Sequence, residues 1–128
     1  MATSSLNRET VQISGGNDSI VIIKDMGDLP GGRVLDVSGV AAGTAVVRAG
    51  HVLYQNAAGD IVPLGVASSG AYDALPEGGE YIGVLKTSVL VSDPRASVLT
   101  MGQVNAAASP YPVTDEIKTA LKHIQFLY

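Results

Sequence analysis

The 128-residue sequence contains no cysteine, no tryptophan and only one phenylalanine. The lack of cysteine excludes a disulfide framework, a thiolate zinc site and a cysteine nucleophile. Because only 5% of the residues are aromatic, the core must be built from Val, Ile, Leu and Ala. Together with 15 glycines that supply turns, this composition favours a mainly β fold.

Positive charge is also scarce. Eight Lys and Arg residues face 12 Asp and Glu residues, which gives a net charge of −4. Nucleic-acid binding depends on clustered positive charge, and these eight residues are scattered, so we expect no nucleic-acid partner. No apolar run approaches the roughly 18 residues of a membrane-spanning helix, and the N-terminus lacks the apolar region of a signal peptide. We therefore expect neither secretion nor a membrane partner.

A chain of this length usually forms one domain. Residues 1–19 are small and polar, with one alternating apolar patch at Val11 and Ile13. We interpret residues 1–19 as an N-terminal arm and residues 20–128 as a single β-rich domain. An arm of this kind adds a strand to the sheet edge of another protein or folds into its own sheet, and the sequence leaves both alternatives open.

Short apolar runs separated by turn residues predict the strands. Residues 56–59 are the predicted loop of a hairpin, with Gly59 in the left-handed conformation. Pro63 lacks an amide donor, so the strand that contains it should be short or lie at a sheet edge. Gly83 is expected to mark a bulge. The predicted strands are 20–23, 33–37, 45–48, 51–55, 60–64, 81–91 and 96–101.

One short helix is predicted near the C-terminus. Thr114 can cap it, and Asp115 and Glu116 in its first turn favour the helix dipole. We expect two to three turns, followed by a final strand that begins near His123. The apolar side chains of this region must be covered by the chain itself or by a neighbouring subunit. The candidate residues for an oligomer interface are Tyr111, Ile124, Phe126 and Tyr128.

No catalytic motif is recognisable. The sequence has no Gly-x-Ser-x-Gly, no His-Glu-x-x-His and no phosphate-binding glycine loop. A metal site would need His51 and His123 brought together with a carboxylate. We expect His51 instead to face solvent or a subunit contact, and His123 to favour the C-terminal end of the helix. We therefore predict no catalytic residues, no metal, no cofactor and no enzyme activity.

A series of short motifs occurs in order within residues 45–105: Val46–Leu53, Gly59-Asp60, Pro63–Gly65, Ile82–Leu85 and Gly102–Val104. In their order, these motifs resemble the head decoration proteins of tailed bacteriophages, the family typified by the lambda decoration protein D. The resemblance implies a small β-clip-like or β-barrel domain that forms a homotrimer. In this chain the domain would also carry the short C-terminal helix, although residues 110–128 match no motif of the family.

The resemblance also implies a function. The trimer would bind the outer surface of the expanded capsid at its threefold positions and stabilise the shell. The protein would thus be part of the virion, assembled in the host cytoplasm, and its partner would be the major capsid protein. In that family an N-terminal arm becomes ordered against the capsid protein. The residues of this chain that match by position and composition are Leu6, Arg8, Val11 and Ile13.

Three alternatives stay open. The protein could be the base of a capsid head fibre. It could also be an accessory β-clip domain of a sugar-acid or nucleotide-processing enzyme, which would need a histidine and a carboxylate in one cleft, such as His51 with Asp60. A carbohydrate-binding module is disfavoured by the shortage of aromatic residues, because sugars usually stack on Trp or Tyr.

Overall fold

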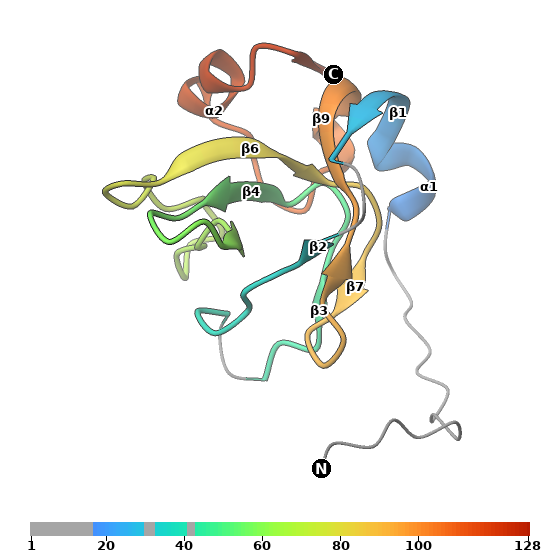
Figure 1. Ribbon diagram of the computed structural model, residues 1–128. Helices are drawn as coiled ribbons and strands as arrows, with labels where there is room; N and C mark the ends of the chain where they lie inside the picture. The colour runs from blue at the N-terminus through green and yellow to red at the C-terminus, as the bar shows by residue number, and fades with distance from the viewer. Residues whose placement is uncertain (1–16, 30–32, 41–42) are drawn as a thin grey trace, which may run out of the picture.

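The computed structural model describes residues 17–29, 33–40 and 43–128. Strands dominate it, which confirms the mainly β fold (Figure 1). Within the described residues there is one six-stranded sheet and two sheets of two strands. The predicted C-terminal helix is α2 (Asp115–Ala120). Two further short helices, α1 (Asp18–Val21) and the 3-10 helix η1 (Ala106–Ala108), were not predicted.

The six-stranded sheet has the order β1-β9-β6-β4-β5, with β10 also paired to β9. These neighbours are antiparallel, except that β10 runs parallel to β9. Strand β9 holds the sheet together. Strands β6 and β10 pair with different parts of one edge of β9, and β1 pairs along its other edge. The bounds are β1 (Ile22–Asp28), β4 (Val52–Gln55), β5 (Ile61–Pro63), β6 (Glu80–Leu85), β9 (Val98–Asn105) and β10 (Ile124–Leu127).

The two small sheets are antiparallel pairs. Strand β2 (Arg33–Val34) pairs with β8 (Arg95–Ala96), and β3 (Val46–Val47) pairs with β7 (Val89–Leu90). The β3 and β7 strands lie side by side in Figure 1. Strand β2 is therefore shorter than the predicted strand 33–37, and β3 is shorter than the predicted strand 45–48.

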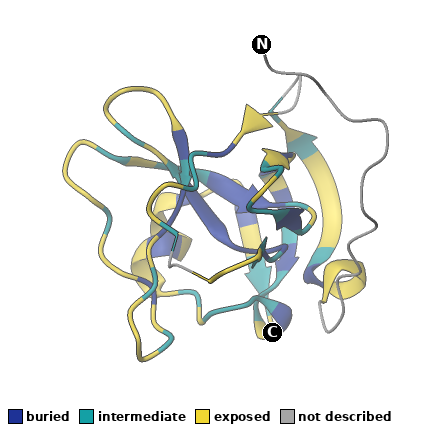
Figure 2. Ribbon diagram, turned by 90° about the horizontal axis from the view of Figure 1, so that it is seen from below, coloured by how far each residue is buried: buried dark blue, intermediate teal, exposed yellow. Residues whose placement is uncertain are grey.

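The core consists of two clusters of buried side chains. Consecutive residues of a strand point to opposite faces of its sheet. Val52 and Leu53 of β4 are both fully buried and belong to different clusters, so the central strands are covered on both faces. One cluster takes Ile117 from α2, and the other takes Val47 from β3. Helices thus cover one face of the sheet and the small sheets cover the other; Figure 2 shows the buried residues at the centre.

The hairpin predictions are confirmed. Gly59 has a φ of 91°, in the left-handed region, and Pro63 lies in the short edge strand β5. Gly83 pairs with Leu53 whereas Tyr81 pairs with Tyr54, so a bulge interrupts the register beside Gly83. The absence of a side chain at Gly83 is required, because a Cβ there would collide with the carbonyl oxygen of Leu99 on β9.

The predicted strand 20–23 is wrong in its first half, since Ile20 and Val21 belong to α1. Their amides donate to the carbonyl oxygen of Asn17 at 3.0 and 2.9 Å. The helical turn lets Val21 become fully buried beside Gly50, where a Cβ would come within 2.5 Å of Val21 Cγ2. Tertiary packing has overridden the β propensity of these residues.

The predicted strand 81–91 is divided between β6 and β7. The chain turns at residues 86–88, where the Ser88 amide donates to the Asp18 carboxylate at 2.8 Å. At the C-terminus, Thr114 Oγ1 caps α2 by accepting from the Ile117 amide at 3.3 Å. The helix has six residues, which is fewer than two turns and shorter than predicted. The final strand β10 begins at Ile124, as predicted.

The predicted arm lies largely outside the described residues. Leu6, Arg8, Val11 and Ile13 all belong to that part of the chain. Of the described residues of the arm, Asn17 precedes α1 and residues 18 and 19 begin it, and the Asn17 side chain donates to the carbonyl oxygen of Ala108 at 3.2 Å. The division into arm and domain stays a prediction, and so does the β-clip-like or β-barrel form.

Candidate functional site

Four large apolar side chains are exposed on α1 and on the neighbouring strands β1 and β9. Ile20 of α1 and Ile23 and Met26 of β1 are 53%, 43% and 56% exposed. Met101 of β9 is 40% exposed and lies opposite Gly27, the residue that follows Met26. We call these four residues the apolar edge. An exposed apolar group of this kind, at the border of a sheet, is typical of a contact surface.

Two residues of the apolar edge, Ile23 and Met26, lie on β1, the last strand in the order of the main sheet. Strand β1 has β9 as its neighbour, and its pairing is interrupted by three register shifts. Figure 2 shows β1 as an exposed strand at the border of the domain. Bulges bend an edge strand and spoil it as a template for a further strand. A partner would therefore contact the side chains of β1 more readily than its backbone.

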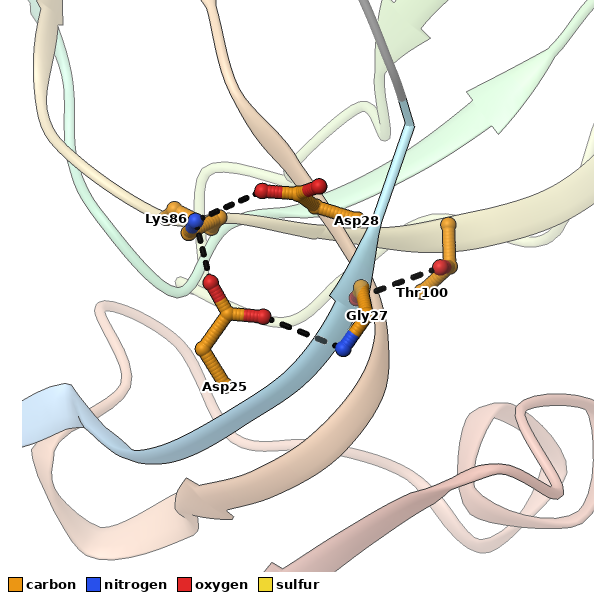
Figure 3. A network of polar contacts seen from close by, with 5 residues as sticks. All are labelled: Asp25, Gly27, Asp28, Lys86 and Thr100. Carbon is orange, nitrogen blue, oxygen red and sulfur yellow. Dashed lines mark hydrogen bonds and ion pairs between the residues drawn. The ribbon is translucent and has the colours of Figure 1, made fainter.

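Polar contacts hold β1 to the domain (Figure 3). The Lys86 ammonium group, on the turn after β6, pairs with the carboxylates of Asp25 and Asp28, and its Nζ lies 2.8 Å from Asp28 Oδ2. These hydrogen bonds raise the pKa of Lys86. Asp25 Oδ1 also accepts from the Gly27 amide at 3.1 Å, and Thr100 Oγ1 donates to the Gly27 carbonyl oxygen at 3.2 Å. The side chains of Lys86 and Thr100 thus hold β1 to the rest of the domain.

A second set of hydrogen bonds fixes α1. The Asp18 carboxylate accepts from the amide and the hydroxyl of Ser88, at 2.8 and 2.6 Å. The Ser88 hydroxyl oxygen in turn accepts from the Ala49 amide at 3.0 Å. Ile20 is therefore presented from a turn that is anchored at its first residue.

A cavity of about 240 Å³ lies on another part of the domain. It brings together five side chains with hydrogen-bonding or ionisable groups, from the segments before and after β3, the loop between β5 and β6, and the segment after η1. The residues that line it are Gly39, Val40, Thr44, Val46, Val47, Arg48, His51, Pro63, Leu64, Gly65, Val66, Asp73 and Tyr111.

His51 is buried within its own chain in the wall of this cavity, contrary to the expectation that it faces solvent or a subunit contact. Its ring makes edge-to-face contacts with Tyr72 and Tyr111, with centroid distances of 5.4 and 5.6 Å. Its Nε2 lies 2.8 Å from the Leu64 carbonyl oxygen. Burial lowers the pKa of His51, although that hydrogen bond acts in the opposite direction. These contacts are not visible in the sequence, because the three rings come from distant segments.

Asp73 is the carboxylate that shares the cavity with His51. Its amide donates to the Gly65 carbonyl oxygen at 2.8 Å, and its carboxylate lies over the Cα of Gly65. Asp60, the partner suggested from the sequence, lines a different cavity. His51 and Asp60 are therefore not brought together. In the described ranges, no group of three or more His, Asp or Glu residues is placed to hold a metal ion.

The four candidate interface residues occupy different environments. Tyr111 belongs to the ring cluster of His51, and Ile124 is buried in the chain's own core. Phe126 is partly buried against the same core, and Tyr128 is 88% exposed. Their role in an interface stays a prediction, and Tyr128 is the member most available for it.

Comparison of the chain with family models, with curated proteins and with solved structures gives no match. Among the helices of the described residues, none has the length and hydropathy needed to span a membrane. The functional argument therefore depends on the geometry of the apolar edge and of the cavity.

Proposed function

We propose that this protein is a structural head decoration protein of a tailed bacteriophage, which binds the outer surface of the major capsid protein shell as a homotrimer and stabilises it. The proposal is supported by the resemblance within residues 45–105. The observation that carries it is the apolar edge, because its four exposed apolar side chains are suited to contact with a partner and Ile20 directly follows the predicted arm.

The fixed position of the apolar edge suits a binding role. Binding costs less free energy when the surface is already ordered, since fewer side chains and loops must be immobilised. Lys86 fixes β1 and Ser88 fixes α1 by the contacts described above. Ile20, Ile23 and Met26 are thus presented on anchored backbone.

Stabilisation of the shell then follows from mass action. A protein that binds the expanded shell and not its precursor lowers the free energy of the expanded state. A trimer that contacts three capsid subunits gains effective concentration at its second and third contacts. The predicted arm residues Leu6, Arg8, Val11 and Ile13 would add a contact next to the apolar edge. No chemical turnover is needed.

Co-sedimentation with empty capsid shells tests this function. We expect the purified protein to sediment with expanded shells of the phage that encodes it, and not with unexpanded shells. The double variant I23S/M26S should bind far more weakly. The matched control is V34S, because Val34 is 67% exposed on β2, outside the apolar edge. Equal binding of both variants would show that the apolar edge is not the contact surface.

Light scattering on the same sample tests the trimer. A monomeric protein that fails to bind either kind of shell would rule out the decoration function. One observation favours a second candidate, an accessory domain of an enzyme: His51 and Asp73 share a cavity. That function requires a small ligand in this cavity, and the co-sedimentation experiment does not measure the binding of such a ligand.

A further inference from the structure

We propose that Met26 and Met101 are oxidation sites, at which a peroxide converts the thioether to a sulfoxide while the protein stays folded. The modified side chains are polar, so oxidation weakens binding to the shell. The modification itself does not depend on the proposed capsid function, whereas its effect on binding rests on that function.

The sulfur groups of this chain are all thioethers. The sequence has no cysteine and three methionines, of which Met1 lies outside the described residues. The other two, Met26 and Met101, both belong to the apolar edge. An oxidant that reacts with sulfur therefore acts, within the described part of the chain, on the residues that the capsid proposal assigns to the contact.

Both thioether side chains are accessible to a small oxidant. Met26 is 56% exposed on β1, the last strand in the order of the main sheet. Met101 is 40% exposed, and its partner across the strand pair is Gly27. A Cβ on Gly27 would lie 3.5 Å from Met101 Cβ, so the glycine leaves uncovered a position where another residue would pack against Met101. Neither side chain requires unfolding to meet a peroxide.

Oxidation at these two positions should leave the fold intact. Sulfoxide formation is disruptive in a core, because it converts an apolar side chain into a polar one. Neither Met26 nor Met101 belongs to the two clusters of buried side chains. The new oxygen can therefore be hydrated in the free protein, and the modification changes the surface without removing core packing.

The reaction is a two-electron oxygen transfer. The sulfur lone pair attacks one oxygen of hydrogen peroxide, the S–O bond forms and the O–O bond breaks. The proton on the transferred oxygen passes to the leaving hydroxide, so the products are the sulfoxide and water. Methionine sulfoxide reductases reverse the change with a dithiol, which becomes a disulfide while the oxygen leaves as water.

A sulfoxide is a poor group for an apolar contact. Its oxygen is a hydrogen-bond acceptor, and burial of an acceptor without a donor costs free energy. Each sulfoxide in the contact should weaken binding by roughly tenfold, the factor that corresponds to one unsatisfied buried polar group.

Peptide mass spectrometry of the full-length protein tests the modification. The protein is treated with dilute hydrogen peroxide, once folded and once in urea. Met26 and Met101 should each gain one oxygen atom in the folded protein at rates close to those in urea, and Met26 should react faster because it is more exposed. Circular dichroism should show that the oxidised protein keeps its fold. Oxidation only in urea, or unfolding of the oxidised protein, would overturn the assignment.

Co-sedimentation with expanded shells tests the effect on binding. The protein is oxidised alone, the peroxide is removed with catalase, and the shells are then added. Oxidation should weaken binding at least tenfold, and methionine sulfoxide reductases should restore it. Equal binding of the oxidised and the untreated protein would show that Met26 and Met101 do not contribute to the contact.

The double variant M26L/M101L is the control, because leucine keeps an apolar side chain but has no thioether. Compared with itself before and after peroxide, it should lose no affinity for the shell. If it loses as much affinity as the unmodified protein, another group is responsible and the effect assigned to Met26 and Met101 is wrong. If the untreated protein does not bind shells, the capsid function fails, while the mass spectra still decide whether the two methionines are oxidation sites.

Discussion

The Lys86 ammonium group lies 2.8 Å from the Asp28 carboxylate, across 58 residues of sequence. This contact joins the turn after β6 to the end of β1. Strand β1 needs such a contact because its pairing with β9 is interrupted at three places. Side-chain ion pairs thus hold the strand that carries Ile23 and Met26, the centre of the apolar edge.

Replacing Lys86 with Met should lower the free energy of unfolding by about 1 kcal/mol, the upper end for partly exposed ion pairs. The methionine keeps the length of the side chain but removes its charge. Urea unfolding measures the effect, with K122M as the control at an exposed lysine of the C-terminal segment. The difference between the two variants should shrink in high salt, because salt screens exposed ion pairs. A salt-independent difference would show that Lys86 acts through packing alone.

Gly83 tests the packing of β6 against β9. G83A should lower the free energy of unfolding by about 3 kcal/mol or prevent folding, because the new Cβ would meet the backbone of Leu99. Backbone atoms of a central strand cannot move aside as a side chain can. G39A is the control, since a Cβ there meets nothing within 4 Å. Thermal unfolding compares the two, and similar melting temperatures would contradict the close approach of β6 and β9.

Local patterns in the sequence predicted the local parts of the fold. The cap at Thr114, the left-handed Gly59 and the edge position of Pro63 each depend on one residue and its near neighbours. The apolar run that includes Ile20 and Val21 predicts a strand, because residue type alone does not show that the chain must turn there. Packing of Val21 beside Gly50 decides that turn, and it links residues far apart in sequence.

The candidate sites were harder to predict for the same reason. Ile and Met are residue types that usually lie in a core. Only the order of the strands shows that Ile23 and Met26 lie at an exposed edge. Asp73 lies between the predicted strands 60–64 and 81–91, in a segment for which the sequence predicts no element, and the fold brings it into the cavity of His51. A sequence pattern does not report which loops meet in space.

Tyr128 tests the predicted oligomer interface. Y128S should shift the trimer toward monomer without a loss of stability, because this side chain is 88% exposed. The matching change at Phe126 is less informative, since Phe126 packs against the core and its loss would also destabilise the fold. Light scattering measures the mass, and circular dichroism checks the fold. An unchanged mass would exclude an interface role for Tyr128.

Deletion of residues 1–13 tests the predicted arm. The truncated protein should fold normally and bind expanded shells much more weakly, because it loses the arm residues but keeps the apolar edge. Co-sedimentation and thermal unfolding give the two results separately. Loss of folding would show instead that the arm belongs to the sheet of its own domain.

The buried His51 should make stability depend on pH. Its pKa is lowered in the folded protein by burial, whereas the unfolded chain has the ordinary value near 6.5. Below pH 6.5 the unfolded chain therefore binds more protons than the folded protein, and the free energy of unfolding falls as the pH falls. The fall continues until the folded pKa is passed, with a slope of at most about 1.4 kcal/mol per pH unit. Well above pH 7 this histidine should contribute almost no pH dependence, because it is unprotonated in both the folded and the unfolded state.

The variant H51Q should remove this slope, because a glutamine amide can still donate to the Leu64 carbonyl oxygen but does not titrate. H123Q is the matched control, since His123 is exposed on the segment before β10. Asp36 affects stability only at lower pH. Hydrogen bonds from Ser38 lower the pKa of Asp36, so its contribution to the free energy of unfolding is lost only as the pH falls below about 3.8. Urea unfolding between pH 5 and 7.5, a window set by the ordinary histidine pKa, measures the slope. If H51Q keeps the slope of the unmodified protein, another group is responsible and His51 is not held neutral by its burial.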